Sequence, residues 1–322
     1  MKGRGSFAGT EIRMTDKQHP SRFATDAVHS GTQHIGDAVN TPIFQSSTYK
    51  LTDERYAGWA AGAQHTLLYA RLSTVNSDAV AQKLMALEGG EDAETFSSGM
   101  GAISATLMAL LNQGDHMVAS ADIYGGTYGL LTEEFPRFGI STTMADMRDP
   151  ASYEAAIQEN TKLLYIETLT NPVLKVCDIE AMADVAKRHN LLLLIDNTFA
   201  SPWGCKPLDM GVDLVLHSTT KYLGGHSDIL GGAVVGSKDL IAQIFMRKVH
   251  FGAAPDPHSC YLLERGMRTL DVRMPRICDN AHDLAVRLEN HSAIERVYHS
   301  KLASHPDFEI AERILPNGSG MI

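Results

Sequence analysis

The stretch Leu191-Leu-Leu-Leu-Ile195-Asp196-Asn197-Thr198 is the clearest indication of the fold in this sequence. Five consecutive apolar residues predict a strand that is buried on both faces, as is typical of the centre of a parallel sheet. The strand ends on the carboxylate of Asp196, which is unfavourable at a buried position unless it meets a positive partner. The stretch therefore predicts a parallel sheet with a polar site at the carboxyl end of one strand.

Short apolar runs alternate with helical patterns on either side of this strand. Strands are predicted at residues 94–98, 116–120, 140–144, 163–166, 191–195, 214–216 and 233–235, and helices at residues 100–111, 127–138, 153–158 and 179–188. This alternation predicts an α/β fold with a doubly wound, mostly parallel sheet. Such sheets bind their ligands beyond the carboxyl ends of the strands.

The regions that flank the alternating segment have a different character. Before residue 74 the pattern is irregular, which suggests an arm that packs on something else. Residues 1–20 are polar and lack an apolar run, so we expect a flexible segment there and neither a signal peptide nor a transit peptide. From about His258 onward the chain becomes mainly helical, which suggests the start of a further domain.

The composition is that of an acidic globular chain. Its 322 residues include 28 Lys and Arg against 38 Asp and Glu, a formal net charge of -10, and no basic tract is present. We therefore expect no nucleic-acid and no membrane partner, because the longest apolar stretches are also far shorter than a membrane span. The four cysteines form no CxxC pair and no metal-ligand spacing, which favours reduced thiols, a cytoplasmic location and no metal.

A lysine follows two hydroxyl residues after another apolar strand, in Leu214-Val-Leu-His-Ser218-Thr-Thr220-Lys221. In a dry crevice a lysine has a lowered pKa and becomes a nucleophile for carbonyl groups. Ser218 and Thr220 are placed to donate hydrogen bonds to a phosphate. The alternative is a loop lysine with solvated hydroxyls, so this segment needs support from others.

Asp196 and the segment Ser97-Ser98-Gly99-Met100-Gly101 supply two such functions. A carboxylate at a strand end can pair with a protonated ring nitrogen and so keep the ring able to accept electrons. Gly99 and the helix that follows offer free N–H groups and a partial positive charge to a phosphate. The alternative for Asp196 is a helix cap or a metal ligand, but no ligand spacing surrounds it. Ser104 stands where a dinucleotide-binding motif needs its third glycine.

Two tyrosines and an arginine complete the set of candidates. Tyr124 follows a predicted strand and could stack on an aromatic ligand, although a single tyrosine is more often partly buried core. Tyr69 and Arg71, in Tyr69-Ala-Arg71, offer a hydroxyl and a guanidinium that suit a phosphate. The alternative for Arg71 is an ordinary surface arginine. Together the candidates supply phosphate donors, a ring stacker, a carboxylate for a ring nitrogen and a lysine for an aldehyde.

On these residues the sequence resembles the Cys/Met-metabolism family of fold-type I pyridoxal-phosphate enzymes. The resemblance covers nearly all of residues 24–320. It is carried by Thr41-Pro-Ile-Phe-Gln45, Tyr69-Ala-Arg71, Leu87-Glu-Gly-Gly90, Ser98-Gly-Met100, Tyr124-Gly-Gly-Thr127, Glu167-Thr-Leu-Thr-Asn-Pro172, Asp196-Asn-Thr198, Ser218-Thr-Thr-Lys-Tyr-Leu223, Arg265-Gly-Met-Arg-Thr-Leu270 and Ser304-His-Pro306.

The resemblance implies a role for each candidate. Lys221 would hold the aldehyde of pyridoxal 5′-phosphate as a Schiff base and later move protons, and Asp196 would face the pyridine nitrogen. Tyr124 would stack on the ring and help to activate the incoming amine. The phosphate would be held by Gly99, Met100, Ser218 and Thr220 of the same subunit and by Tyr69 and Arg71 of the neighbouring one, with Glu167 and Asn171 around the ring.

The resemblance also implies an activity and an assembly. We expect a pyridoxal-phosphate-dependent carbon–sulfur lyase of transsulfuration, with γ-elimination from cystathionine as the first expectation. The alternative is γ-replacement of the cystathionine γ-synthase or O-acetylhomoserine sulfhydrylase type. We expect a homotetramer of two dimers with shared active sites. The chain would divide into an arm on the neighbouring subunit (1–73), a cofactor-binding domain (74–257) and the start of an incomplete C-terminal α+β domain (258–322).

Three features depart from the family pattern. Thr74-Val75-Asn76 replaces the Asn-Pro-Thr that usually follows the Tyr-x-Arg motif, so the turn beside the phosphate arm is expected to differ. Gly126 stands where methionine γ-lyases carry a cysteine, which counts against that activity. The sequence ends at Ile322, before the part in which the family carries its arginine for the substrate α-carboxylate, so no residue is assigned to that function.

Two rival interpretations belong to other classes of protein. Ser218-Thr-Thr-Lys221 also matches the Ser-x-x-Lys motif of a group of serine hydrolases, but the accompanying Ser-Asp-Asn and Lys-Thr-Gly motifs are missing. The other rival is a non-catalytic relative that serves as a binding or regulatory subunit. An acyl probe on Ser218 would support the first rival, and the intact mass of the natural protein bears on the second.

Overall fold

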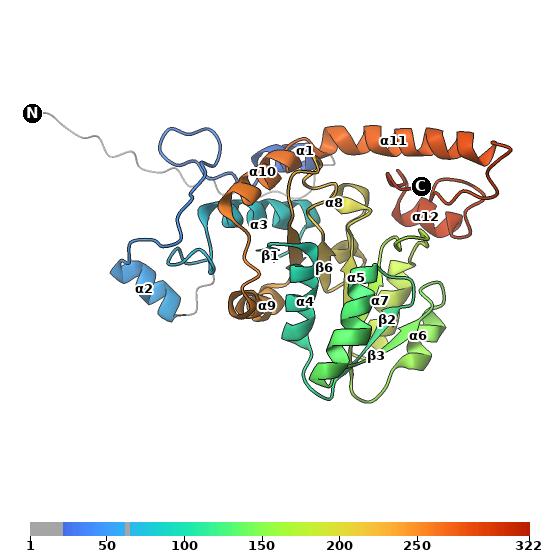
Figure 1. Cartoon of the computed structure of the whole chain (residues 1–322), viewed down its shortest axis with the longest axis horizontal. Helices are drawn as coiled ribbons and strands as arrows, with labels where there is room; N and C mark the ends of the chain where they lie inside the picture. Colours follow the sequence, from blue (N-terminus) through green and yellow to red (C-terminus); the bar gives the residue numbers. More distant parts are fainter. Residues whose placement is uncertain (1–21, 62–64) are drawn as a thin grey trace, which may run out of the picture.

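A computed structural model describes residues 22–61 and 65–322, and a seven-stranded sheet runs through the centre of this part of the chain (Figure 1). The prediction for residues 1–20 lies outside the described residues. Across the sheet the strands follow the order β1 (Asp92–Phe96), β7 (Gly232–Gly236), β6 (Leu214–His217), β5 (Leu192–Asp196), β4 (Thr161–Glu167), β2 (His116–Ser120) and β3 (Ser141–Ala145).

The sheet is mostly parallel, as the sequence predicted. Strands β3, β2, β4, β5 and β6 run parallel to one another, and β7 alone among the described strands is antiparallel to both of its neighbours. The register places Glu167 of β4 beside Asp196 of β5. The carboxyl ends of β4, β5 and β6 therefore meet at one edge, where open α/β sheets bind ligands.

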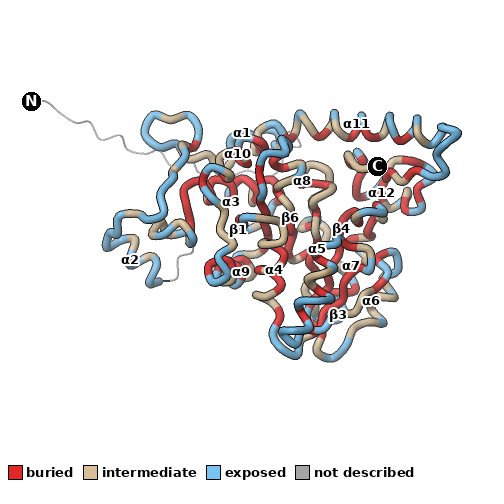
Figure 2. The backbone as a smooth tube through the Cα atoms, viewed as in Figure 1, coloured by how far each residue is buried: buried red, intermediate tan, exposed pale blue. Residues whose placement is uncertain are grey.

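Helices cover both faces of the sheet. Helices α4 (Gly99–Leu110) and α9 (Lys238–Phe251) pack on one face with the side chains of Leu194 and Leu216. Helix α7 (Ile179–Arg188) packs on the other face, and a short helix, α6 (Pro150–Ala156), lies beside it. The tube in Figure 2 shows this arrangement as buried strands within a shell of partly exposed helices.

The expected helix at residues 127–138 is divided into three short elements. Helix α5 (Gly125–Gly129) continues into the π-helical turn η1 (Leu130–Glu134) and the 3₁₀ turn η2 (Phe135–Phe138). Proline lacks a backbone donor and clashes with the preceding turn of a regular helix. Pro136 therefore explains why the regular hydrogen-bond pattern is lost before residue 138.

Helices that precede β1 and follow β7 pack together beside β1. Helix α3 (Val75–Glu88) packs against α10 (Pro257–Met267) and beside β1, and α1 (Arg22–His29) contacts α3. Helix α2 (Asp53–Ala60) has no buried residue and extends from the left side of the molecule in Figure 1. Helix α11 (Leu270–Glu289) runs along the top above α12 (Phe308–Ile314), and α8 (Ser201–Gly204) and η3 (Pro207–Met210) follow β5.

None of the described helices is both long enough and apolar enough to cross a membrane.

Candidate active site

A pocket of about 1020 Å³ opens at the carboxyl ends of β4, β5 and β6. Each strand end contributes side chains to it, and so does the start of α4. The pocket is lined by Ser98, Gly99, Met100, Ile103, Tyr124, Glu167, Leu169, Asn171, Asp196, Thr198, Phe199, Ser218, Thr220, Lys221, Tyr222, Gly225, Ser227, Asp228, Ile229, Leu230, Arg273, Ile277 and Met321.

Most of the residues singled out from the sequence lie in this one pocket. They come from five separate segments of the chain, which the sheet brings together. The group consists of Gly99, Met100, Tyr124, Glu167, Asn171, Asp196, Ser218, Thr220 and Lys221. Tyr69 and Arg71 do not line it.

Glu167 fixes the loops on either side of the pocket. Its carboxylate is buried and accepts hydrogen bonds from the backbone N–H of Tyr124 at 2.9 Å and of Asn171 at 3.1 Å. Burial, together with the nearby carboxylate of Asp196, raises the pKa of Glu167 to about 8. One side chain therefore holds the loop of the ring-stacking candidate and the loop of Asn171 at fixed positions.

Asp196 is connected to the phosphate-binding candidates through a hydroxyl. The backbone N–H and the hydroxyl of Thr198 donate to Asp196 Oδ1 at 2.9 and 2.5 Å. The same hydroxyl accepts a hydrogen bond from the backbone N–H of Ser218 at 2.8 Å. Burial raises the pKa of Asp196, and the two bonds from Thr198 act against that shift. Thr198 thus fixes the position of Asp196 relative to Ser218.

The start of α4 offers backbone N–H groups at one end of the pocket. Ser98 is the N-cap, and its hydroxyl accepts from the N–H of Gly101 at 3.0 Å. The N–H groups of Gly99 and Met100 precede the intrahelical hydrogen bonds, and no described residue accepts from them. A Cβ at residue 99 would lie 3.0 Å from the Ser218 Cβ and 3.1 Å from its hydroxyl oxygen. A glycine at residue 99 therefore keeps this space open for a ligand.

Thr220 contributes less directly to that end of the pocket. Its hydroxyl accepts from the N–H of Gly231 at 3.0 Å and lies 3.3 Å from the carbonyl oxygen of the same residue. The hydroxyl has to leave this carbonyl before it can donate to a phosphate. Thr220 therefore also holds Gly231, the residue before β7, against the turn that carries Lys221.

Lys221 lies on the turn that follows β6. Its carbonyl accepts from the N–H of Gly225 at 2.7 Å, and Gly225 has the positive φ of 74° that glycine adopts readily. The side chain of Lys221 is exposed, so this chain alone does not provide the dry crevice that we expected around it. Tyr124 is also exposed, at 44%, so a face of its ring is accessible to a ligand.

The two residues that fall outside the pocket form a unit of their own. The guanidinium of Arg71 lies over the ring of Tyr69 at 5.5 Å and donates to the carbonyl of Val249 at 3.0 Å. Both side chains are exposed. In a single chain they are therefore held in place but do not reach the pocket of Lys221.

Arg273 of α11 lines the pocket but was not predicted from the sequence. It donates to the hydroxyl of Thr269 at 3.1 Å and to the carbonyl of Gly266 at 2.9 Å. No carboxylate among the described residues pairs with it, and burial lowers its pKa. Its position inside a regular helical pattern gave no local signal.

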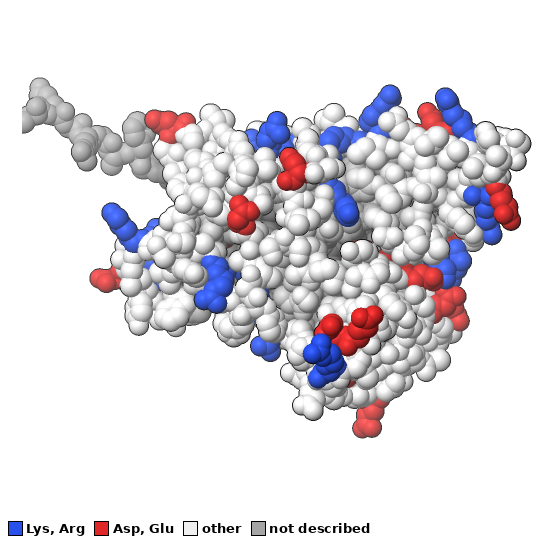
Figure 3. Space-filling model, viewed as in Figure 1, with Lys and Arg blue, Asp and Glu red and all other residues white. Residues whose placement is uncertain are grey.

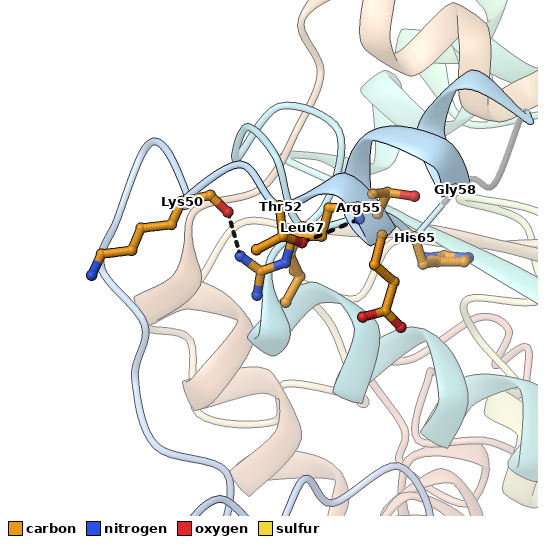
Figure 4. A pocket seen from close by; sticks show the side chains of 8 residues that line it. Lys50, Thr52, Arg55, Gly58, His65 and Leu67 are labelled. Carbon is orange, nitrogen blue, oxygen red and sulfur yellow. Dashed lines mark hydrogen bonds between the residues drawn. The ribbon is translucent and has the colours of Figure 1, made fainter.

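A second hollow, of about 690 Å³, lies beside α2 (Figure 4). Arg55 donates there to the carbonyl of Lys50 at 2.8 Å, and its N–H donates to the Thr52 hydroxyl at 3.3 Å. The hollow shares no residue with the pocket of Lys221. Its wall is mainly the polar surface of the arm, so it does not contribute to the same site.

The face drawn in Figure 3 and the metal-binding residue types of the described chain give no other candidate. Figure 3 shows Lys and Arg interspersed with Asp and Glu on the visible face, without a large patch of one sign. The described residues contain no group of three or more His, Cys, Asp or Glu that could hold a metal ion. The pocket at the strand ends is therefore the site that gathers the chemistry.

Comparison with known proteins identifies close relatives. The family described as Cys/Met metabolism PLP-dependent enzyme matches residues 24–322. An L-methionine gamma-lyase from Porphyromonas gingivalis is 42% identical over 307 residues, covering 94% of this chain and 77% of the relative. A cystathionine gamma-lyase from Bacillus subtilis is 44% identical over 294 residues, covering 91% and 75%.

Two further comparisons broaden this picture. A probable cystathionine gamma-synthase from Herpetosiphon aurantiacus is 41% identical over 303 residues, covering 93% of this chain and 92% of the relative. Among solved structures, cystathionine gamma-lyase from Lactobacillus plantarum complexed with L-serine matches with a TM-score of 0.87 and 38% identity. That match covers 92% of this chain and 77% of the other.

Proposed function

This chain belongs to the Cys/Met metabolism family of pyridoxal-phosphate-dependent enzymes, and we propose that it catalyses γ-elimination from cystathionine. Its cofactor is pyridoxal 5′-phosphate, and its class is that of the carbon–sulfur lyases and γ-synthases of sulfur amino-acid metabolism. The observation that carries the proposal is the single pocket in which Lys221, Asp196, Tyr124 and the start of α4 come together.

The residues present fit the cofactor. The start of α4 offers two free N–H groups, and the absence of a Cβ at Gly99 leaves room beside Ser218 for a phosphate. Asp196 would face the pyridine nitrogen, and the exposed ring of Tyr124 would cover the cofactor. When bound, the cofactor supplies an electron-accepting ring next to the substrate α-carbon.

The protein side chains would supply attachment, orientation and proton transfer. The Nζ of Lys221 would be the covalent anchor for the aldehyde and, once released, the base that takes the proton from the substrate α-carbon. The hydroxyl of Tyr124 would help to deprotonate the incoming amine, and Glu167 holds the Tyr124 loop for that purpose. Asp196 would keep the ring nitrogen protonated, because a carboxylate stabilises the charged form of the ring.

The environment of Gly126 favours cystathionine over methionine as the substrate. A Cβ at this residue would lie 2.6 Å from Tyr124 Cε1 and 3.1 Å from the sulfur of Met100. A cysteine, which methionine γ-lyases carry at this position, would displace the ring of Tyr124. The 42% identity to the L-methionine gamma-lyase of Porphyromonas gingivalis therefore does not by itself assign that substrate.

A γ-replacement reaction is the second candidate. The probable cystathionine gamma-synthase of Herpetosiphon aurantiacus is nearly as similar as the lyases and matches this chain over 92% of its own length. Elimination and replacement begin with the same proton transfers by Lys221. In both reactions the γ-substituent leaves. In elimination the leaving group is the thiol of cystathionine and nothing takes its place at the γ-carbon, whereas in replacement an acyloxy group leaves and a thiol then bonds to the γ-carbon.

We also propose that the active site is shared between two copies of the chain. Tyr69 and Arg71 are held together but lie outside the pocket of their own chain, and the arm exposes large apolar side chains at Val39, Leu51 and Trp59. Packing of this arm on a neighbour would bury that surface and bring Arg71 to a phosphate. Two such dimers would form the tetramer. The four cysteines are free and buried, which supports a cytoplasmic location.

The substrate proposal is tested by turnover of a panel of substrates by the purified enzyme. Cystathionine, methionine and O-acetylhomoserine with a thiol are compared by release of 2-oxobutyrate and by mass detection of any replacement product. We expect cysteine and 2-oxobutyrate from cystathionine at least tenfold faster than 2-oxobutyrate from methionine, a difference typical of pocket discrimination of about 1–3 kcal/mol. Replacement products without 2-oxobutyrate from cystathionine would establish the second candidate instead, and Lys221→Ala is the inactive control.

A further inference from the structure

Behind the three strand ends that carry the pocket residues lies a second row of polar side chains. Successive residues of a strand point to opposite faces of its sheet. Glu167, Asp196 and Ser218 line the pocket. Their chain neighbours Thr168, Asn197 and His217 do not line it, and they are buried to 0%, 0% and 2% exposure.

These rear residues are joined in one hydrogen-bonded network. The Thr168 hydroxyl donates to Asn197 Oδ1 at 2.7 Å, and Asn197 Nδ2 donates to Glu88 Oε1 at 3.2 Å and to the carbonyl of Cys205 at 2.9 Å. His217 Nε2 lies 2.5 Å from the same oxygen of Glu88. Glu88, the last residue of α3, is fully buried. One carboxylate therefore holds the ends of β5 and β6 directly, and that of β4 through Asn197.

Burying this network costs more free energy than burying a neutral network of the same shape would cost. Glu88 Oε2 and His217 Nδ1 are both buried without a hydrogen-bond partner among the described residues. A buried carboxylate needs hydrogen-bond partners, and the side chains of Asn197 and His217 are those that contact Glu88 Oε1. Buried polar atoms left without a partner in a native fold call for an explanation.

The network lies next to Asp196, a residue of the pocket. Asp196 is on β5, beside β6, and the network joins the ends of both strands through Asn197 and His217. Burial raises the pKa of Asp196, and the hydrogen bonds from Thr198, followed by the nearby His217, act against that rise. Cys205, whose carbonyl accepts from Asn197, follows α8, and burial followed by Glu88 raises the pKa of its thiol to about 12.

We propose that Glu88 and His217 are positioning residues of the cofactor site, which hold the strand ends of Asp196 and Ser218 in place. This inference rests on the proposed cofactor-binding role of Asp196. It assigns function to two residues that touch neither cofactor nor substrate. Loss of the pair is expected to weaken cofactor binding.

The test measures binding of pyridoxal 5′-phosphate to the full-length apoprotein by absorption titration at neutral pH. We expect Glu88→Gln to weaken binding by about tenfold, comparable to the lower end of what loss of an outer-shell partner causes at metal sites. Glu88→Asp, which keeps the carboxylate, should recover part of the loss.

The matched control is Leu84→Ala, one turn earlier on the same helix and fully buried. It lowers stability without removing a hydrogen bond of the network, so it should lower the unfolding midpoint and leave the affinity unchanged. Wild-type affinity in Glu88→Gln, no recovery in Glu88→Asp, or an equal loss in Leu84→Ala would overturn the inference. If Glu88→Gln does not fold, His217→Gln carries the same expectation. If Asp196→Ala binds the cofactor as the wild type does, the proposed site fails rather than the positioning network.

Discussion

The substitution Gly99→Ala tests the anion-binding end of the pocket. The added Cβ would lie 3.0 Å from the Ser218 Cβ and 3.1 Å from the Ser218 hydroxyl oxygen, so that this side chain must shift by a few tenths of an ångström. The shift displaces one hydrogen-bond donor from a bound phosphate. A hydrogen bond to a charged group contributes about 1.5–3 kcal/mol, which corresponds to about 10- to 150-fold weaker cofactor binding.

The same substitution should leave the fold intact or slightly more stable. Alanine is favoured over glycine inside helices by about 0.8–1 kcal/mol, and residue 99 is the first residue of α4. Opposite changes in affinity and stability separate a filled phosphate site from general damage to the fold. The assay is absorption titration of the apoprotein with pyridoxal 5′-phosphate, together with urea unfolding of the apoprotein.

The control for this experiment is Gly129→Ala. Gly129 has helical backbone angles, and a Cβ at this residue would meet nothing within 4 Å. We expect this variant to bind the cofactor as the wild type does. Wild-type affinity in Gly99→Ala, or an equal loss in both variants, would refute the assignment of the start of α4 to the phosphate.

Three further predictions follow from single contacts. Gly126→Cys should displace the ring of Tyr124 and lower kcat/KM for cystathionine at least about tenfold in steady-state assays, and unchanged kinetics would remove the argument about substrate choice. The raised pKa of Glu167 means that the folded apoprotein keeps a proton which the unfolded chain loses near pH 4.5, so the free energy of unfolding should fall by roughly 1–3 kcal/mol between pH 5 and pH 8. In urea unfolding, Glu167→Gln should reduce this dependence of stability on pH. An unchanged dependence would contradict the raised pKa of Glu167. Asp307→Ala removes the buried carboxylate that Arg148 binds through two hydrogen bonds at 2.7 and 2.9 Å. This variant should lower the free energy of unfolding by about 2–4 kcal/mol. A loss below about 1 kcal/mol would show that the ion pair is effectively solvated.

The parts of the fold that follow from local patterns could be predicted from the sequence. The apolar run at residues 191–195 became β5, shifted by one residue to Leu192–Asp196, and α7 has the predicted bounds Ile179–Arg188. The start of α6 was placed too late, at residue 153, although Asp149 caps the helix and Pro150 occupies its first turn. These are standard helix-start signals.

The direction of β7 could not be predicted in the same way. A buried run of Gly232–Gly236 looks the same whether its neighbours run parallel or antiparallel to it. The direction is decided by the path of the chain over residues 218–231, where the structure has turns and no helix that would carry the chain across a face of the sheet. Parallel strands are usually joined by such a crossover helix.

The residues of the candidate site also differ in how far local sequence patterns reveal them. Residues at or shortly after the end of an apolar strand, such as Asp196 and Lys221, could be found because strand ends in an α/β sheet converge at one edge. Glu88 and His217 are 129 residues apart in the chain, so no local spacing could reveal that they form a buried pair. Tyr69 and Arg71 reach no site in their own chain, so their predicted role depends on a second copy.

The most direct measurement is the location of the covalently bound cofactor. The purified protein is treated with pyridoxal 5′-phosphate, reduced with borohydride, digested and mapped by mass spectrometry, with Lys221→Ala in parallel. We predict a phosphopyridoxyl group on the peptide that contains Lys221, and loss of both this label and the visible absorption band in the variant. A label on another lysine, or an unchanged absorption band in Lys221→Ala, would contradict the assignment of this pocket.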